Sequence, residues 1–289
     1  MNFRAHAVSA IGKTRLRETL IQPGFYIAAA VGLLVAFVVQ YAFSLSVGSG
    51  GFEPSLNRLF EVVGRVLTST FGETFVDELF ADGPYLFALF AAFVPVYLYV
   101  VISSLFRSGM EKQVGAMELL TSGPADGTAC YLAALVRDVT VTFIYLLALL
   151  GAFAAGSLFH NLAITPRVVL GFVQLLFVAL LFFAYATFLG SATNGPISAL
   201  ISDIGLTLLF VLIYGAKYAV IGGGVRSVAA SVGIVLEWLS PLHYWKLGAE
   251  SAAMQQWTGV LLALIALAGL SGVLIVGSHL ILSRKGARA

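Results

Sequence analysis

The sequence predicts an all-α integral membrane protein with six transmembrane helices. Hydrophobic residues make up 60% of the 289 residues and charged residues 10%, which leaves too little polar surface for a domain that folds in water. A helix needs about 20 apolar residues to cross a bilayer. Six stretches approach that length, at 24–45, 84–106, 136–159, 168–190, 204–221 and 257–282. The strands of a membrane β-barrel are about half as long, so a barrel is excluded.

Basic residues mark one side of these spans. Lys and Arg near the span ends number ten on the side of both termini and five on the other side. Because cytoplasmic loops retain positive charge during insertion, we expect both termini in the cytoplasm. The chain is then a single transmembrane domain, 1–289, in the cell membrane. Residues before 24 lack a cleavage site behind a short apolar core, so we expect the first span to remain in the mature protein.

Two long segments lie on the opposite, external side of this topology. In 46–83, apolar residues recur every three or four positions between 56 and 67, which predicts an amphipathic helix. That helix either covers a pathway as a lid or packs against the spans. The segment 222–256 begins with three glycines and carries aromatic residues around a Ser-Pro pair. Such a composition favours an interfacial or re-entrant turn.

The most informative segment, 107–128, joins the second and third spans. It contains a charged helical turn followed by a Gly-Pro break. Glu111 and Glu118 are seven residues apart, so their carboxylates share a helix face. Two leucines after Glu118 supply a small apolar contact surface. A short charged protrusion of this kind can dock on a soluble partner, although an ordinary solvated loop has the same composition. The candidate coupling residues are Glu111, Lys112, Gly115, Glu118, Leu119 and Leu120.

This pattern resembles the cytoplasmic coupling segment of ABC-2 type transporter permeases. In order, the family pattern has an acidic residue, a basic residue, any two residues, a glycine, a small residue, any one residue and then Glu-Leu-Leu. A proline follows shortly afterwards, and in this chain it is Pro124. The chain is most similar to the six-span gliding-motility and copper-site-maturation branch, which implies a type V exporter-like fold. Residues 1–23 then correspond to a cytoplasmic connecting helix. A second family-like pattern before the last span, in the external re-entrant turn, comprises Ser240, Pro241, Tyr244 and Gly248.

The resemblance implies a function and partners. We expect a permease subunit that moves an unidentified substrate, by export, in membrane lipid. Two copies of a separate ABC ATPase subunit, which binds ATP and Mg, would dock on residues 111–120. A second permease copy or a paralogue would complete the transporter. The alternatives are an autonomous channel or secondary carrier, and a membrane assembly factor without transport.

Nothing in the sequence indicates an enzyme, a metal site or a nucleic-acid partner. Residues 7–14 imitate the end of a P-loop, but Ala7 replaces the first glycine and no strand precedes it. We interpret Lys13 as a charge that anchors the chain in the cytoplasm. We expect Cys130 to be a packing residue. We expect Arg137 and Asp138 to point apart, because they are neighbours on a helix, and no residue pattern in the spans predicts a proton relay.

A ridge of small residues on the first span predicts close helix packing. Its members, four residues apart, are Gly24, Ala28, Gly32 and Ala36. Small side chains let helix backbones approach closely in lipid. Family permeases form dimers through the first span, so the resemblance implies a subunit seam at this ridge. Packing within one chain is the alternative.

Overall fold

The structure is a computed structural model of the chain, and each regular element in its described part is an α-helix. It describes residues 3–48, 62, 65–66, 68–69, 85–113, 127–160, 164–193, 195–223 and 235–285. The expected amphipathic helix of 46–83 lies mostly outside these residues, although the five described positions between 62 and 69 are helical.

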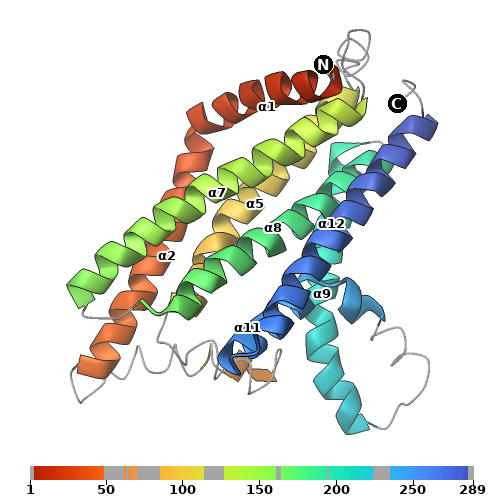
Figure 1. The fold of residues 1–289 in the computed structure, drawn as a ribbon. Coiled ribbons are helices and arrows are strands. Elements are labelled where there is room, and N and C mark those ends of the chain that lie inside the picture. Colours follow the sequence, from red (N-terminus) through yellow and green to blue (C-terminus); the bar gives the residue numbers. More distant parts are fainter. Residues whose placement is uncertain are drawn as a thin grey trace.

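Six of the helices are long and apolar enough to cross a membrane, which confirms the predicted count. Among the other described helices, α1 is more polar than the spans and α11 is shorter. In chain order the elements are α1 (Phe3–Ile21), α2 (Pro23–Gly48), α5 (Tyr85–Gln113), α7 (Gly127–His160), α8 (Pro166–Ala192), α9 (Pro196–Gly223), α11 (Pro241–Ala253) and α12 (Trp257–Lys285), as Figure 1 shows. The chain is therefore an all-α, multi-pass membrane protein.

Two helices begin earlier than the apolar stretches that predict them. The third span begins at Gly127 instead of 136, and the fifth at Pro196 instead of 204. Hydropathy detects only the apolar part of a helix, whereas backbone hydrogen bonding continues through polar residues. Proline is favoured in the first helical turn because it has no N–H to leave unpaired, which explains the start of α9 at Pro196. The extension brings Asp203 inside the fifth span.

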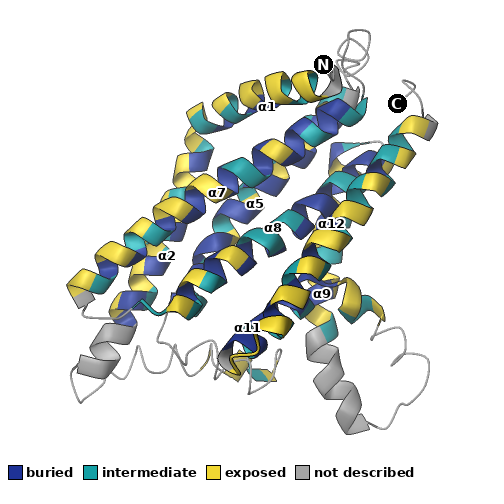
Figure 2. Cartoon of the chain, in the orientation of Figure 1, coloured by how far each residue is buried: buried dark blue, intermediate teal, exposed yellow. Residues whose placement is uncertain are grey.

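Helix α8 lies at the centre of the bundle. About two thirds of its apolar window, 67%, is buried, against 22% for α9 and α12 and 28% for α2. It packs against α5, α7, α11 and α12. Aromatic rings fill the contact with α5, where the ring centroids of Tyr97 and Phe182 are 5.2 Å apart. The outer helices expose their apolar faces (Figure 2). A bilayer supplies the apolar surroundings that those faces require.

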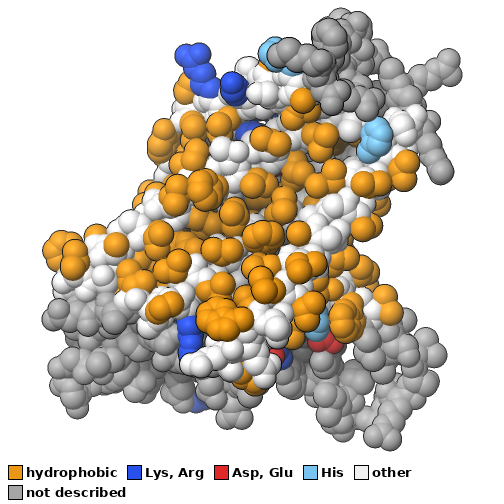
Figure 3. All heavy atoms as spheres, viewed as in Figure 1, with side chains coloured by type: hydrophobic (Ala, Val, Ile, Leu, Met, Phe, Trp, Pro, Cys, Tyr) orange, Lys and Arg blue, Asp and Glu red, His pale blue; other side chains and the backbone are white. Residues whose placement is uncertain are grey.

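The beginning of α1 and the end of α12 lie at the same end of the bundle (Figure 1). We call this the α1 end, because α1 packs across the beginning of α7 there; the turn between α11 and α12 lies at the opposite end. Visible Lys and Arg side chains gather toward the two ends of the molecule, with a broad hydrophobic surface between them (Figure 3). This arrangement agrees with an even number of spans. The cytoplasmic location of the α1 end remains a prediction from the charges.

Candidate functional site

Four charged side chains from α1 and α5 form one ion-pair cluster at the α1 end. We call Arg15, Glu18, Arg107 and Glu111 the charge cluster. Arg15 Nη2 donates to Glu111 Oε2 at 2.5 Å, and Arg107 Nε donates to Glu111 Oε1 at 3.0 Å. Arg107 Nη1 also donates to Glu18 Oε2. Each carboxylate therefore has an arginine partner, and Glu111 has two.

Helix periodicity brings these groups together. Arg107 and Glu111 are four residues apart, so they share one face of α5. On α1, Arg15 points inward and is only 4% exposed. Its guanidinium also reaches the backbone carbonyl oxygen of Cys130 at 3.4 Å. Arg15 thus connects the N-terminal helix with the end of the second span and the beginning of the third.

A second ion pair lies beside this cluster on α7. Arg137 Nε donates to Asp138 Oδ1 at 2.7 Å, and both residues are 3% exposed. The prediction that these neighbours point apart is wrong. A long arginine side chain can fold back to the next residue, and burial makes an unpaired charge costly. Arg15 also acts electrostatically on Asp138, so the pair adjoins the charge cluster.

Of the six predicted coupling residues, Glu111 alone has a described side chain. The α5 helix continues through Lys112 to Gln113, and Gly115, Glu118, Leu119 and Leu120 lie outside the described residues. Glu111 is 17% exposed and is held by two arginines of its own chain. It is therefore placed to link helices within the subunit. A docking role for the segment depends on the residues beyond it.

The small-residue ridge of α2 is covered by helices of the same chain. A Cβ atom added to Gly32 would lie 2.5 Å from the carbonyl oxygen of Ala92 and 2.1 Å from the hydroxyl of Tyr145. One added to Gly24 would lie 2.8 Å from the ring of Tyr99. Ala36 is 1% exposed, and Ala28 packs against the core. This packing matches the intrachain alternative, so the ridge gives no reason to place a subunit seam there.

The predicted re-entrant turn is a helix break with satisfied backbone groups. Ser240 caps α11 by accepting a hydrogen bond from Leu242 N at 3.2 Å, and Pro241 occupies the first turn. The carbonyl oxygens before the break accept hydrogen bonds from tyrosine hydroxyls at 2.7 Å, Leu239 from Tyr185 and Trp238 from Tyr244.

The position of Tyr185 places this break inside the bundle. Tyr185 is seven residues from the end of α8, about 10 Å along the helix. Irregular backbone at such a depth requires internal hydrogen bonds, which the two tyrosines supply. Further along α11, Gly248 lies against Gln174 of α8, where an added Cβ would be 2.7 Å from Nε2.

Asp203 is a candidate functional residue that the sequence analysis missed. It lies in α9, is 3% exposed, and has no hydrogen bond or ion pair within the described part of the chain. It acts electrostatically on Tyr97 of α5, whose hydroxyl is 3.4 Å from Thr207 Oγ1, one turn from Asp203. An ionisable residue inside a span is costly and marks function by default. A fifth span predicted to begin at Pro196 would have included Asp203 as an ionisable residue within the membrane.

Comparisons with known proteins assign no family. No protein-family model matches the chain, and no curated protein sequence matches it. The resemblance to ABC-2 permeases therefore rests on the residue pattern alone.

Proposed function

We propose that this chain is the membrane-spanning subunit of an ABC-2 type transporter. The observation that carries the proposal is the position of Glu111, the first acidic residue of the coupling-like pattern. It pairs with Arg15 of α1 and Arg107 of α5. The segment that resembles a docking site thus begins where side-chain contacts join the N-terminal helix, the second span and the third span.

The junction suggests how a displacement is transmitted. A soluble ATPase that docks on residues 111–120 pushes on the ends of α5 and α7. Arg15 transfers that movement to α1, because it holds Glu111 on one side and the Cys130 carbonyl on the other. Helix α1 continues into α2 after a short break at Gln22. A displacement at the junction therefore reaches three spans together.

The chemistry of ATP belongs to a partner in this proposal. Two copies of an ABC ATPase bind ATP and Mg, and a second copy of this chain or a paralogue completes the pathway. The substrate is unidentified, and the proposed direction is export, by analogy with the resembled family.

Charge reversal on the two sides of the membrane tests the docking. The tagged chain is purified from native membranes with and without a charge-reversed residue, and the co-purified ATPase is identified and assayed. We expect an ABC ATPase with the unmodified chain and its loss with Glu118→Lys. Glu78→Lys, in the predicted external segment, is the matched control and should retain it. Retention with Glu118→Lys, or equal loss with both variants, contradicts the proposal.

A second candidate, an ion-coupled carrier, is favoured by Asp203. A buried carboxyl group without a hydrogen-bond partner among the described residues is suited to bind a proton or a cation during transport. Proteoliposomes that hold a pH-sensitive dye distinguish the two functions in the absence of ATP. A carrier gives a proton flux that Asp203→Asn abolishes and the conservative Thr207→Ser retains. The ABC-2 proposal predicts no flux in any of the three proteins.

A further inference from the structure

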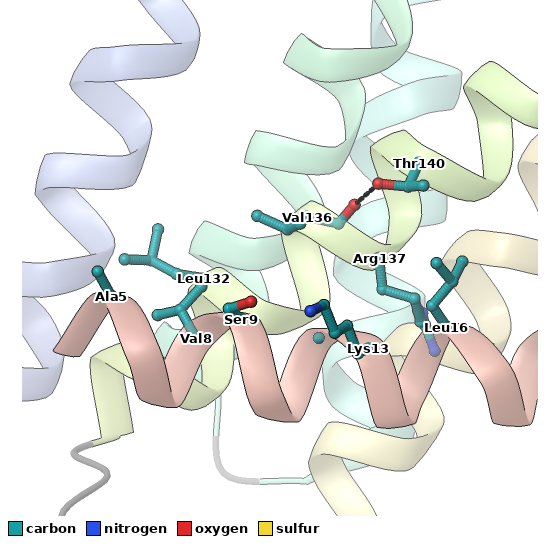
Figure 4. A pocket seen from close by; sticks show the side chains of 10 residues that line it. Ala5, Val8, Ser9, Lys13, Leu16, Leu132, Val136, Arg137 and Thr140 are labelled. Carbon is teal, nitrogen blue, oxygen red and sulfur yellow. Dashed lines mark hydrogen bonds between the residues drawn. The ribbon is translucent and has the colours of Figure 1, made fainter. Parts of the chain in front are cut away.

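A cavity of about 640 Å³ lies between α1 and α7 at the α1 end (Figure 4). Its walls are largely apolar, with Val8 and Leu16 contributed by α1 and Leu132 and Val136 by α7. Lys13 extends from α1 toward α7 at this cavity, on the same side of the helix as Ser9. The cavity therefore combines an apolar interior with a cation at its edge.

The charges around the cavity favour an anionic ligand. Arg137, which also lines it, is neutralised by Asp138. Lys13 is exposed and has no ion pair within the described residues. Ser9 lies one helical turn from Lys13, so an ammonium group and a hydroxyl group can donate to the same oxyanion. A phosphate group fits this pair of donors.

The apolar wall of the cavity continues along the outside of the bundle. Val136 is 49% exposed, and Phe143, Ile144 and Leu147 follow it at helical spacing with exposures of 47%, 38% and 52%. These four residues share one face of α7. They form an apolar stripe that runs from the cavity toward the opposite end of the bundle.

We propose that this cavity binds an anionic glycerophospholipid. The phosphate lies between Lys13 and Ser9, the glycerol region fills the cavity, and an acyl chain follows the stripe from Val136 to Leu147. The position agrees with a headgroup, since the cavity lies at the end of the spans. On the charge-based topology it faces the cytoplasmic leaflet, which is rich in anionic lipids. The apolar walls and the stripe argue for a lipid instead of free phosphate.

Native mass spectrometry of the detergent-solubilised chain tests the proposal without any ATPase. The protein is titrated with phosphatidylglycerol and with phosphatidylcholine of the same acyl chains. We expect tighter binding of phosphatidylglycerol. Lys13→Ala should weaken that binding about fivefold, as expected for one basic residue at a lipid surface. Arg17→Ala removes an exposed cation of the same helix that does not line the cavity, and it should leave the affinity unchanged.

A second variant tests the cavity separately from its charge. Val136→Trp fills the space at a half-exposed position and keeps Lys13, so it should weaken the binding of both lipids while the chain melts at the same temperature as the unmodified protein. Three results overturn the proposal: equal binding of the two lipids by the unmodified chain, equal losses with Lys13→Ala and Arg17→Ala, or displacement of phosphatidylglycerol by millimolar inorganic phosphate.

Discussion

Replacing Glu111 by glutamine tests whether the charge cluster holds the α1 end together. The substitution keeps the size of the side chain and removes the charge that two arginines share. Arg107 keeps Glu18 as a partner, but Arg15 has a side chain only 5% exposed and loses its carboxylate. Removing one partner of a buried ion pair destabilises a protein by about 3–5 kcal/mol. Because Glu111 is 17% exposed, we expect the lower end of this range, about 3 kcal/mol.

The chain contains its own control for this magnitude. Glu18 and its partner Arg107 have side chains that are 44% and 34% exposed, so Glu18→Gln should lower the free energy of unfolding by less than about 1 kcal/mol. The double variant Arg15→Met with Glu111→Met should regain most of the loss, because it leaves no charge without a partner.

Equilibrium unfolding of the purified protein in mixed micelles, with a rising fraction of sodium dodecyl sulfate, measures these free energies through tryptophan fluorescence. The measurement requires a single cooperative transition. Equal losses for Glu111→Gln and Glu18→Gln would refute the reasoning, because burial would then make no difference to the pair. A loss below about 1 kcal/mol for Glu111→Gln refutes it too.

Three further substitutions give expected outcomes in the same assay. Gly32→Leu should destabilise the bundle by about 1–3 kcal/mol or more, since an added Cβ already lies 2.5 Å from the Ala92 carbonyl oxygen; an unchanged midpoint contradicts the packing of α2. Gln174→Met should be neutral or stabilising, because Gln174 Nε2 is buried without a hydrogen-bond partner in the described chain. A large loss of stability would contradict this, since it would mean that the Gln174 amide group makes a stabilising hydrogen bond. Ser240→Ala should lower stability by about 1 kcal/mol through the lost cap to Leu242 N; an unchanged free energy of unfolding contradicts the cap.

Several features of the fold could be predicted from local sequence because they depend on local chemistry. The bilayer thickness fixes the length of a span, so apolar stretches near 20 residues located the six helices that are long and apolar enough to cross a membrane. The Ser-Pro pair with its aromatic neighbours indicated an irregular turn, and the structure has the cap of α11 at Ser240. Cys130 was expected to pack in the interior, and it is 1% exposed.

The candidate site was less predictable, because its contacts join residues far apart in the chain. Glu111 was identified as a functional residue, but its partner Arg15 lies 96 residues earlier and no local pattern connects them. Asp203 was missed because the apolar stretch that predicted the fifth span began at 204, one residue after it, whereas the helix begins at Pro196. The pairing of Arg137 with Asp138 was excluded on helix geometry, which ignores the reach of an arginine side chain.

The sequence by itself determined that this chain is a six-span helical membrane protein, and it singled out 107–128 as the polar segment between two spans. Those properties follow from the thickness of the bilayer and the cost of placing polar groups in it, and both act on each stretch of chain independently. The tertiary structure decided which faces meet: the α2 ridge packs against α5 and α7, Glu111 faces Arg15, and Asp203 is buried beside α5. These contacts depend on how whole helices pack against one another. Hydropathy carries no information about which helix faces meet, because all apolar faces are equivalent in lipid.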